Sequence, residues 1–148
     1  MPSTQELLER YRAVMPSFVT PLYETPISIE RGEGGYVWDL EGNKYLDFFG
    51  GILTTMIGHS VPEVVEAVQE QASKVMHTST LYLNEQVVSF AEEVAAVSGI
   101  PDARVLFTTS GSEANDTAIL LATNYRQSNQ VLAMRNSYHG RSLTTQAV

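Results

Sequence analysis

VLFTTSGSEAND, residues 105–116, is the stretch that decides the fold of this chain. Its first three residues, 105–107, are apolar and β-prone, and we expect them to form a buried strand. Residues 108–112 then make a turn that is rich in hydroxyl groups around Gly111. Apolar residues recur at helical spacing from 113 to 122, so the pattern predicts a helix directly after the turn.

A strand that runs through a small turn into the start of a helix favours an anion site. The first N–H groups of a helix have no partner within the helix, and the helix dipole adds partial positive charge there. Gly111 lets the backbone approach a ligand closely, and Ser110 and Ser112 can add hydroxyl donors. On spacing alone, an ordinary helix with Ser112 as its N-cap is an equal alternative.

Composition and charge exclude several classes of function. The chain has 148 residues and a net charge of −8, and its nine basic residues are scattered, which argues against a nucleic-acid surface. No apolar stretch is long enough to span a membrane. The chain contains no cysteine, and its three histidines lack the spacing of metal ligands, so we expect no metal site. No signal peptide is visible, and we expect a cytoplasmic location.

The remaining pattern alternates between helices and short strands. Ser3 and Glu6 have the spacing of a capping box at the start of the first expected helix. We expect helices over residues 3–14, 60–76, 84–98, 112–126 and, as an unfinished start, 142–148. We expect a hairpin with strands at 36–40 and 44–49, and one more short strand at 131–134. The alternation after about residue 60 favours an α/β architecture.

Three segments together resemble a known family. They are YVWDLEGNKYLDFFGGI at 36–52, TTSGSEANDTA at 108–118 and NSYHGRS at 136–142. They resemble the class III, pyridoxal-phosphate-dependent aminotransferases of fold type I, and HTSTLY at 77–82 is most similar to the alanine–glyoxylate and ω-amino-acid members. The resemblance covers almost the whole chain and keeps the order and spacing of the family's motifs.

This resemblance implies an α/β fold of which the chain is the N-terminal part. Residues 1–60, with a helix and the hairpin, would belong to the small domain. Residues 61–148 would be the truncated first part of the large cofactor-binding domain, with an incomplete sheet. In the family, the lysine that binds the cofactor covalently and the acidic partner of the pyridine nitrogen lie further along the chain. We therefore expect no catalytic residue in this chain, and a homodimer in the parent enzyme.

The resemblance also assigns residues to pyridoxal 5′-phosphate. Gly111 and Ser112 match the phosphate site, and Ser110 lies in the same turn. Tyr138 matches the aromatic residue that stacks on the pyridine ring, although by itself it could be a packed loop aromatic. His139 lies beside it and would contact the ring or its phenolic oxygen.

Two further residues match positions that contact the substrate. Arg141 matches an arginine that holds a distal carboxylate in several members, since a guanidinium can bind a carboxylate at two points. Without the resemblance, a surface charge at a helix start is the simpler interpretation of Arg141. Ile52 matches a position in the pocket wall that differs between subgroups.

The parent enzyme would move an amino group from an amine or ω-amino acid to a keto acid, and the chain alone would be inactive. One alternative is a non-catalytic remnant that acts as a dimerisation or binding module. Another is a different reaction on the same scaffold, by an aminomutase, a racemase or a decarboxylase.

Overall fold

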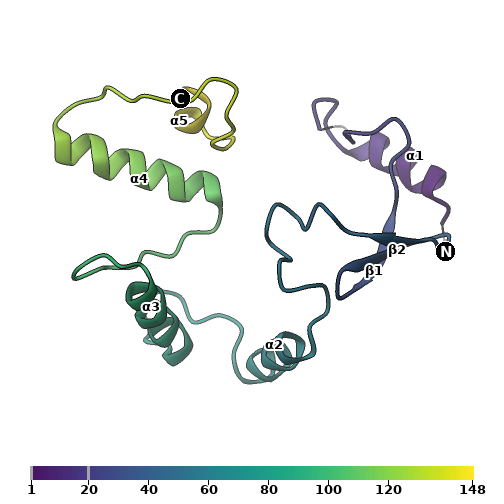
Figure 1. Ribbon diagram of the computed structural model, residues 1–148, viewed down its shortest axis with the longest axis horizontal. Helices are drawn as coiled ribbons and strands as arrows, with labels where there is room; N and C mark the ends of the chain where they lie inside the picture. Colours follow the sequence, from purple (N-terminus) through teal and green to yellow (C-terminus); the bar gives the residue numbers. More distant parts are fainter. Residues whose placement is uncertain (1, 20) are drawn as a thin grey trace. The chain divides into compact units, whose positions relative to one another are not determined.

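A computed structural model describes residues 2–19 and 21–148. Within these ranges the chain forms five helices and three strands (Figure 1). They are α1 (Thr4–Val14), β1 (Ile29–Glu33), β2 (Tyr36–Asp39), β3 (Lys44–Leu46), α2 (Pro62–Lys74), α3 (Glu85–Val97), α4 (Gly111–Arg126) and α5 (Leu143–Gln146). The chain divides into two compact units, residues 1–78 and 79–148. The boundary expected near residue 60 refers to the domains of a whole enzyme and stays a prediction.

The N-terminal helix α1 starts with the expected capping box. Ser3 accepts a hydrogen bond from the N–H of Glu6, and the Glu6 carboxylate accepts the N–H of Ser3 at 2.7 Å. These bonds from Ser3 lower the pKa of Glu6. The next residue, Thr4, donates its N–H at 3.0 Å and its hydroxyl at 2.9 Å to the carboxylate of Glu41, so the helix start is tied to the hairpin turn.

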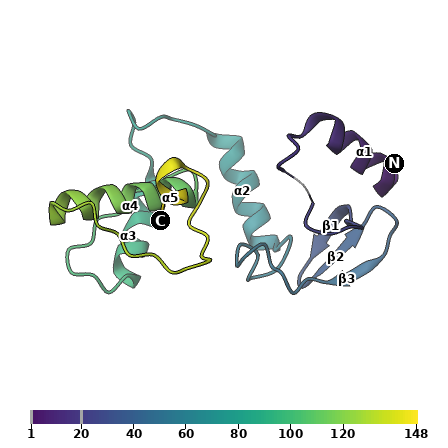
Figure 2. The ribbon, with the colours of Figure 1, turned by 90° about the horizontal axis from the view of Figure 1, so that it is seen from above.

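The three strands form one antiparallel sheet in the order β1-β2-β3, seen side by side in Figure 2. The expected hairpin is confirmed as β2 and β3, with shorter strands than the pattern indicated. The first strand, β1, was missed because its sequence IERGE carries three charges and a glycine instead of an alternating apolar pattern. It is held to the sheet by pairing with β2, and Arg31 lies 3.6 Å from the Trp38 ring.

Asp39 organises the hairpin turn. Its side chain is only 3% exposed and accepts the N–H of Asn43 at 2.7 Å, the Asn43 amide at 2.9 Å and the Tyr45 hydroxyl at 2.7 Å. Burial alone would raise the pKa of Asp39, but these hydrogen bonds outweigh it, and the pKa is lowered. The turn is therefore fixed by an ionised carboxylate.

The helices begin close to where the sequence pattern places them. Asn84 caps α3 by accepting the N–H of Val87 at 3.2 Å. The start of α2 has no side-chain cap, and Pro62 occupies its first turn. Ser142 caps the short helix α5, which packs on α4 (Figures 1 and 2).

The two strands expected at 105–107 and 131–134 are wrong for the structure as described. Both segments are irregular, and neither pairs with another segment. A strand exists only as part of a ladder, and within the described residues these apolar segments have no neighbour to pair with. Phe107 instead stacks on Phe90 of α3 at a centroid distance of 5.3 Å, and Leu132 is fully exposed.

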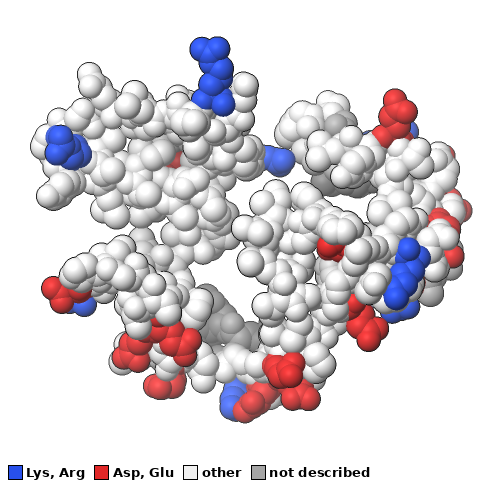
Figure 3. Space-filling view, viewed as in Figure 1, with Lys and Arg blue, Asp and Glu red and all other residues white. Residues whose placement is uncertain are grey.

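Apolar faces remain uncovered in both units. Among the described residues the only buried apolar side chain is Val37 in β2, and no helix has a buried apolar residue. The face of α2 that carries Val64, Val65 and Val68 is exposed. Acidic side chains gather over α2 and over α3 in Figure 3, as expected for their solvated faces. The fold is thus a mixed α/β segment whose apolar surfaces lack a cover.

Candidate functional site

The N-cap of α4 lies two residues before Ser112, the serine named as N-cap in the alternative interpretation of the sequence. Ser110, not Ser112, is the N-cap: its backbone is extended and its hydroxyl accepts the N–H of Glu113 at 3.2 Å. The helix begins at Gly111, so Ser112 lies within its first turn. The prediction failed because two serines stand two residues apart, and only the backbone conformation decides which one caps. The hydroxyl of Ser112 is consequently free for other contacts.

The turn before α4 is fixed by Glu113. Its carboxylate accepts the N–H of Thr109 at 2.8 Å and also the Thr109 hydroxyl. These two bonds lower the pKa of Glu113, the hydroxyl bond having the larger effect. The N–H groups of Gly111 and Ser112 donate to no acceptor in residues 2–19 and 21–148. A Cβ added at Gly111 would meet nothing within 4 Å, so the space beside this residue is open.

The loop 136–142 packs against this helix start through three long-range hydrogen bonds. The side-chain amide of Asn115 donates to the carbonyl of His139 at 2.7 Å. The N–H of Arg141 donates to Oγ of Ser112 at 3.1 Å. The hydroxyl of Ser142 donates to Asp116 at 2.7 Å. The second and third motifs of the sequence are therefore brought together within one unit.

Gly140 makes this close approach possible. It is buried, with φ of +138°, and a Cβ at this position would lie 2.5 Å from Oγ of Ser112 and 2.7 Å from Oγ1 of Thr145. Both the backbone conformation and the space therefore require glycine. Sequence reasoning assigned no role to Gly140, and the only available signal was a glycine between two candidate site residues.

The side chains of the loop differ in their surroundings. Tyr138 is 75% exposed and stacks on no other ring in the described part of the chain, so its faces are available. Nε2 of His139 is buried and has no hydrogen-bond partner there. The Arg141 side chain is exposed and makes no ion pair with a described residue. Ile52 belongs to the other unit, where it lies on an exposed loop.

The start of α4 fits a phosphate group. It offers two open N–H donors, the hydroxyl of Ser112 and the positive end of a 16-residue helix. The chain's two lysines are engaged elsewhere: Nζ of Lys44 lies 3.8 Å from the Tyr36 ring centroid, and Nζ of Lys74 lies 2.6 Å from the Glu70 carboxylate. The residues at the start of α4 therefore fit the phosphate end of pyridoxal phosphate, and both lysines belong to the first unit.

Within residues 2–19 and 21–148, no group of three or more histidine, cysteine, aspartate or glutamate residues could hold a metal ion. None of the helices in these ranges combines the length and the apolar character needed to cross a membrane.

Comparison with known proteins agrees with the motifs. The family model for class III aminotransferases matches residues 19–148. The chain is 38% identical over 143 residues to the acetylornithine aminotransferase of Methanothermobacter thermautotrophicus, covering 96% of this chain and 35% of that protein. It is 34% identical over 134 residues to the mitochondrial alanine–glyoxylate aminotransferase 2 of Homo sapiens, covering 90% of this chain and 26% of that protein.

The solved structures give the same result. The structure of an (S)-enantioselective omega-transaminase from Thermomicrobium roseum superposes with a TM-score of 0.83 at 32% identity, covering 99% of this chain and 36% of that one. The chain thus spans between about a quarter and about a third of the length of these relatives. Because the family model covers most of the chain, and the motifs at 108–118 and 136–142 meet in the second unit, the chain belongs to the class III aminotransferase family.

Proposed function

We propose that the chain is the N-terminal part of a pyridoxal-phosphate-dependent enzyme that moves an amino group from an amine or ω-amino acid to a keto acid. Pyruvate, glyoxylate and 2-oxoglutarate are the acceptors we expect. The observation that carries the proposal is the docking of residues 139–142 on the start of α4, through the bond from Arg141 to Ser112. This bond joins the backbone of the proposed substrate-binding residue to the proposed phosphate-binding residue, and so supports the proposal.

The first task of these residues is to hold the cofactor. The N–H groups of Gly111 and Ser112 and the Ser112 hydroxyl would bind the phosphate, since all three can donate to an anion. Tyr138 would lie against the pyridine ring with one flat face and exclude water from it. When bound, pyridoxal phosphate supplies an electron sink for the amino-acid carbon. The buried Nε2 of His139 is a polar atom that still needs a partner, in accordance with a contact to the ring or its phenolic oxygen.

The second task is to select the substrate. The Arg141 guanidinium is exposed and unpaired in the described ranges, while its backbone is fixed by the 3.1 Å bond to Ser112. It can therefore hold a distal carboxylate by two parallel hydrogen bonds at a set distance from the phosphate. Ile52 would form part of the apolar wall, in accordance with its exposed side chain.

The remaining parts of the proposal concern the whole enzyme. Other parts of the whole enzyme would supply the lysine that binds the cofactor covalently and the acidic partner of the pyridine nitrogen. This chain alone would therefore be inactive. A homodimer and a cytoplasmic location belong to the same proposal. The uncovered apolar faces of the helices favour a segment that is covered in a larger assembly.

The test compares two amines in the longer enzyme. We expect Arg141→Ala to lower kcat/KM for an ω-amino acid by raising KM, and to leave a simple amine without a carboxylate nearly unchanged. Cofactor content should stay close to that of the wild type. Equal loss for both amines would make Arg141 structural. If the wild type binds cofactor but transfers no amino group to any keto acid, the result favours an aminomutase, a racemase or a decarboxylase. If the wild type neither binds cofactor nor transfers an amino group, the result favours the non-catalytic module.

A further inference from the structure

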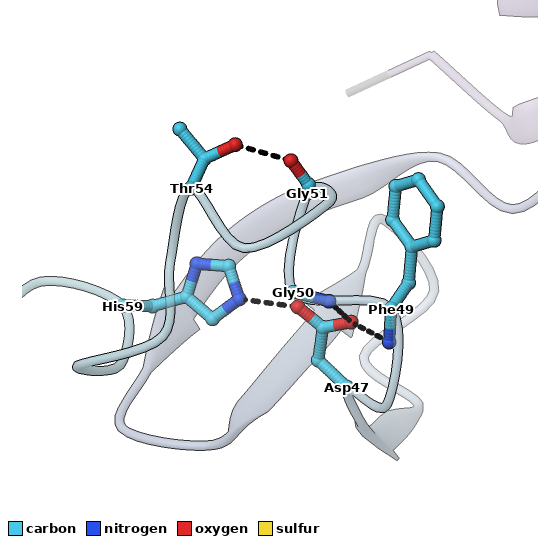
Figure 4. Close-up of polar contacts among 6 residues, drawn as sticks. All are labelled: Asp47, Phe49, Gly50, Gly51, Thr54 and His59. Atoms are coloured by element: carbon cyan, nitrogen blue, oxygen red, sulfur yellow. Dashed lines mark hydrogen bonds and ion pairs between the residues drawn. The ribbon is translucent and has the colours of Figure 1, made fainter. Parts of the chain in front are cut away.

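A second polar cluster lies in the first unit, at the loop that carries Ile52. Figure 4 shows Asp47 and His59 facing each other across the base of this loop. Nε2 of His59 lies 2.8 Å from Oδ2 of Asp47, and the two side chains are 24% and 16% exposed. The residues are 12 positions apart, so the contact closes the loop 48–58 at both ends.

The Asp47 carboxylate also holds the first residues of the loop. Its Oδ1 accepts the N–H of Phe49 at 2.9 Å and of Gly50 at 3.0 Å. The pKa of Asp47 is lowered mainly by the hydrogen bond from the Gly50 N–H, and the hydrogen bond from His59 has the second largest effect. An ionised carboxylate only accepts hydrogen bonds, so Nε2 of His59 carries the proton between them.

His59 is fixed from the other side by the sheet. Its N–H donates to the carbonyl of Gly34 at 2.8 Å, and its carbonyl accepts the N–H of Gly34 at 3.0 Å. A Cβ at Gly32 would lie 2.6 Å from Cγ of the His59 ring, so β1 approaches the imidazole closely. Asp47 directly follows β3. Both ends of the loop are thus anchored on the same small sheet.

The loop between these anchors has an unusual backbone. Gly50, Gly51, Ile52 and Leu53 all have positive φ, of 56°, 56°, 55° and 71°. For a β-branched residue such as isoleucine this conformation is an outlier. Such a conformation persists only where surrounding contacts determine it, and here the N–H of Thr55 donates to the carbonyl of Gly50 at 3.1 Å. Strained backbone of this kind gathers at ligand-binding segments.

The left-handed segment 50–53 exposes two apolar side chains. Ile52 is 78% exposed and Leu53 is also exposed. We propose that Asp47 and His59 form a clamp that positions this segment, and so determine how Ile52 meets the part of the substrate next to the amino group. The inference rests on the proposed function, which places Ile52 in the substrate-binding wall. Asp47 and His59 are positioning residues, because they act through the loop and not on the substrate.

The test uses the longer holoenzyme with three variants. His59→Ala removes the clamp, and His59→Gln keeps a donor that can reach the carboxylate. The matched control is Lys74→Ala, which breaks an exposed ion pair of 2.6 Å on α2. Two amines that differ in bulk beside the amino group are compared, together with the hydrogen exchange of residues 48–58.

We expect His59→Ala to change the ratio of kcat/KM between the bulky and the small amine by on the order of tenfold, mainly through KM, as for loss of one hydrogen bond to a charged group. Exchange of the Phe49 and Gly50 amides should become faster, and His59→Gln should restore part of both effects. Cofactor content should not change, and Lys74→Ala should match the wild type.

Faster exchange with an unchanged ratio between the amines would overturn the inference, since the clamp would then be merely structural. Unchanged exchange would overturn it as well. A wild-type enzyme that transfers no amino group would instead refute the proposed function. In that case faster exchange in His59→Ala would still show that Asp47 and His59 hold the loop. Their role in positioning Ile52 toward the substrate would be refuted together with the proposed function.

Discussion

Removal of one hydroxyl group, in Ser112→Ala, tests the phosphate site most directly. Oγ of Ser112 accepts the N–H of Arg141 at 3.1 Å, and its own proton is used by no contact in the described ranges. The hydroxyl can therefore donate to a phosphate while it holds the loop. The substitution leaves the helix start intact, because Ser110 is the N-cap.

The expected loss follows from the number of donors. A hydrogen bond to a charged group contributes about 1.5–3 kcal/mol, and about 1.4 kcal/mol corresponds to a tenfold change in affinity. Ser112→Ala should therefore weaken cofactor binding roughly ten- to hundredfold. Binding should persist, because the N–H groups of Gly111 and of residue 112 remain. Loss of the acceptor for the Arg141 N–H leaves the loop held to α4 by the bonds from Asn115 to His139 and from Ser142 to Asp116.

The assay is titration of the longer apoenzyme with pyridoxal phosphate, followed by absorbance. Thr123→Ala is the matched control, because it removes a hydroxyl of the same helix that donates to the carbonyl of Ile119 at 2.8 Å. Wild-type affinity in Ser112→Ala, or an equal loss in Thr123→Ala, would refute the assignment of the Ser112 hydroxyl to the phosphate.

Three further predictions concern the loop and the hairpin. Gly140→Ala should weaken cofactor binding at least as much as Ser112→Ala, because its Cβ would lie 2.5 Å from Oγ of Ser112. A wild-type affinity of Gly140→Ala in the apoenzyme titration would contradict the close packing. Tyr138→Ala should shift the absorbance of the bound cofactor and also weaken cofactor binding. An unchanged spectrum would refute the stacking role of Tyr138. The lowered pKa of Asp39 means that its contribution to hairpin stability is present above about pH 4 and lost as the pH falls through the folded-state value. Fluorescence of Trp38, the chain's single tryptophan, should follow that loss, and Asp39→Asn should abolish the acid transition.

Local elements of this chain could be predicted because their causes lie within a few residues. The capping box of Ser3 and Glu6 depends on a spacing of three residues and is confirmed, and the Asn84 cap of α3 has the same spacing. The hairpin is set by its turn, where Asp39 binds Asn43 four positions away. The turn before α4 was predicted for the same reason, although Ser110 and not Ser112 caps the helix.

Pairing between distant segments was decided only by the tertiary structure. The apolar runs at 105–107 and 131–134 have the composition of strands, yet they remain irregular where no neighbour pairs with them. The charged segment β1 has a poor composition and is nevertheless a strand, because β2 supplies its hydrogen bonds. Composition sets how well a residue suits a strand, whereas the ladder depends on a partner from elsewhere in the chain.

The sequence by itself named the candidate site residues, and the tertiary structure decided which of those in the second unit meet. The motif around Ser112 and the motif around Tyr138 were recognisable separately. Their junction depends on Gly140, whose missing Cβ lets the two segments approach. The contact of Asp47 with His59 likewise joins residues 12 positions apart. Such contacts depend on shape and distance after folding, and a linear pattern of residue types does not encode them locally.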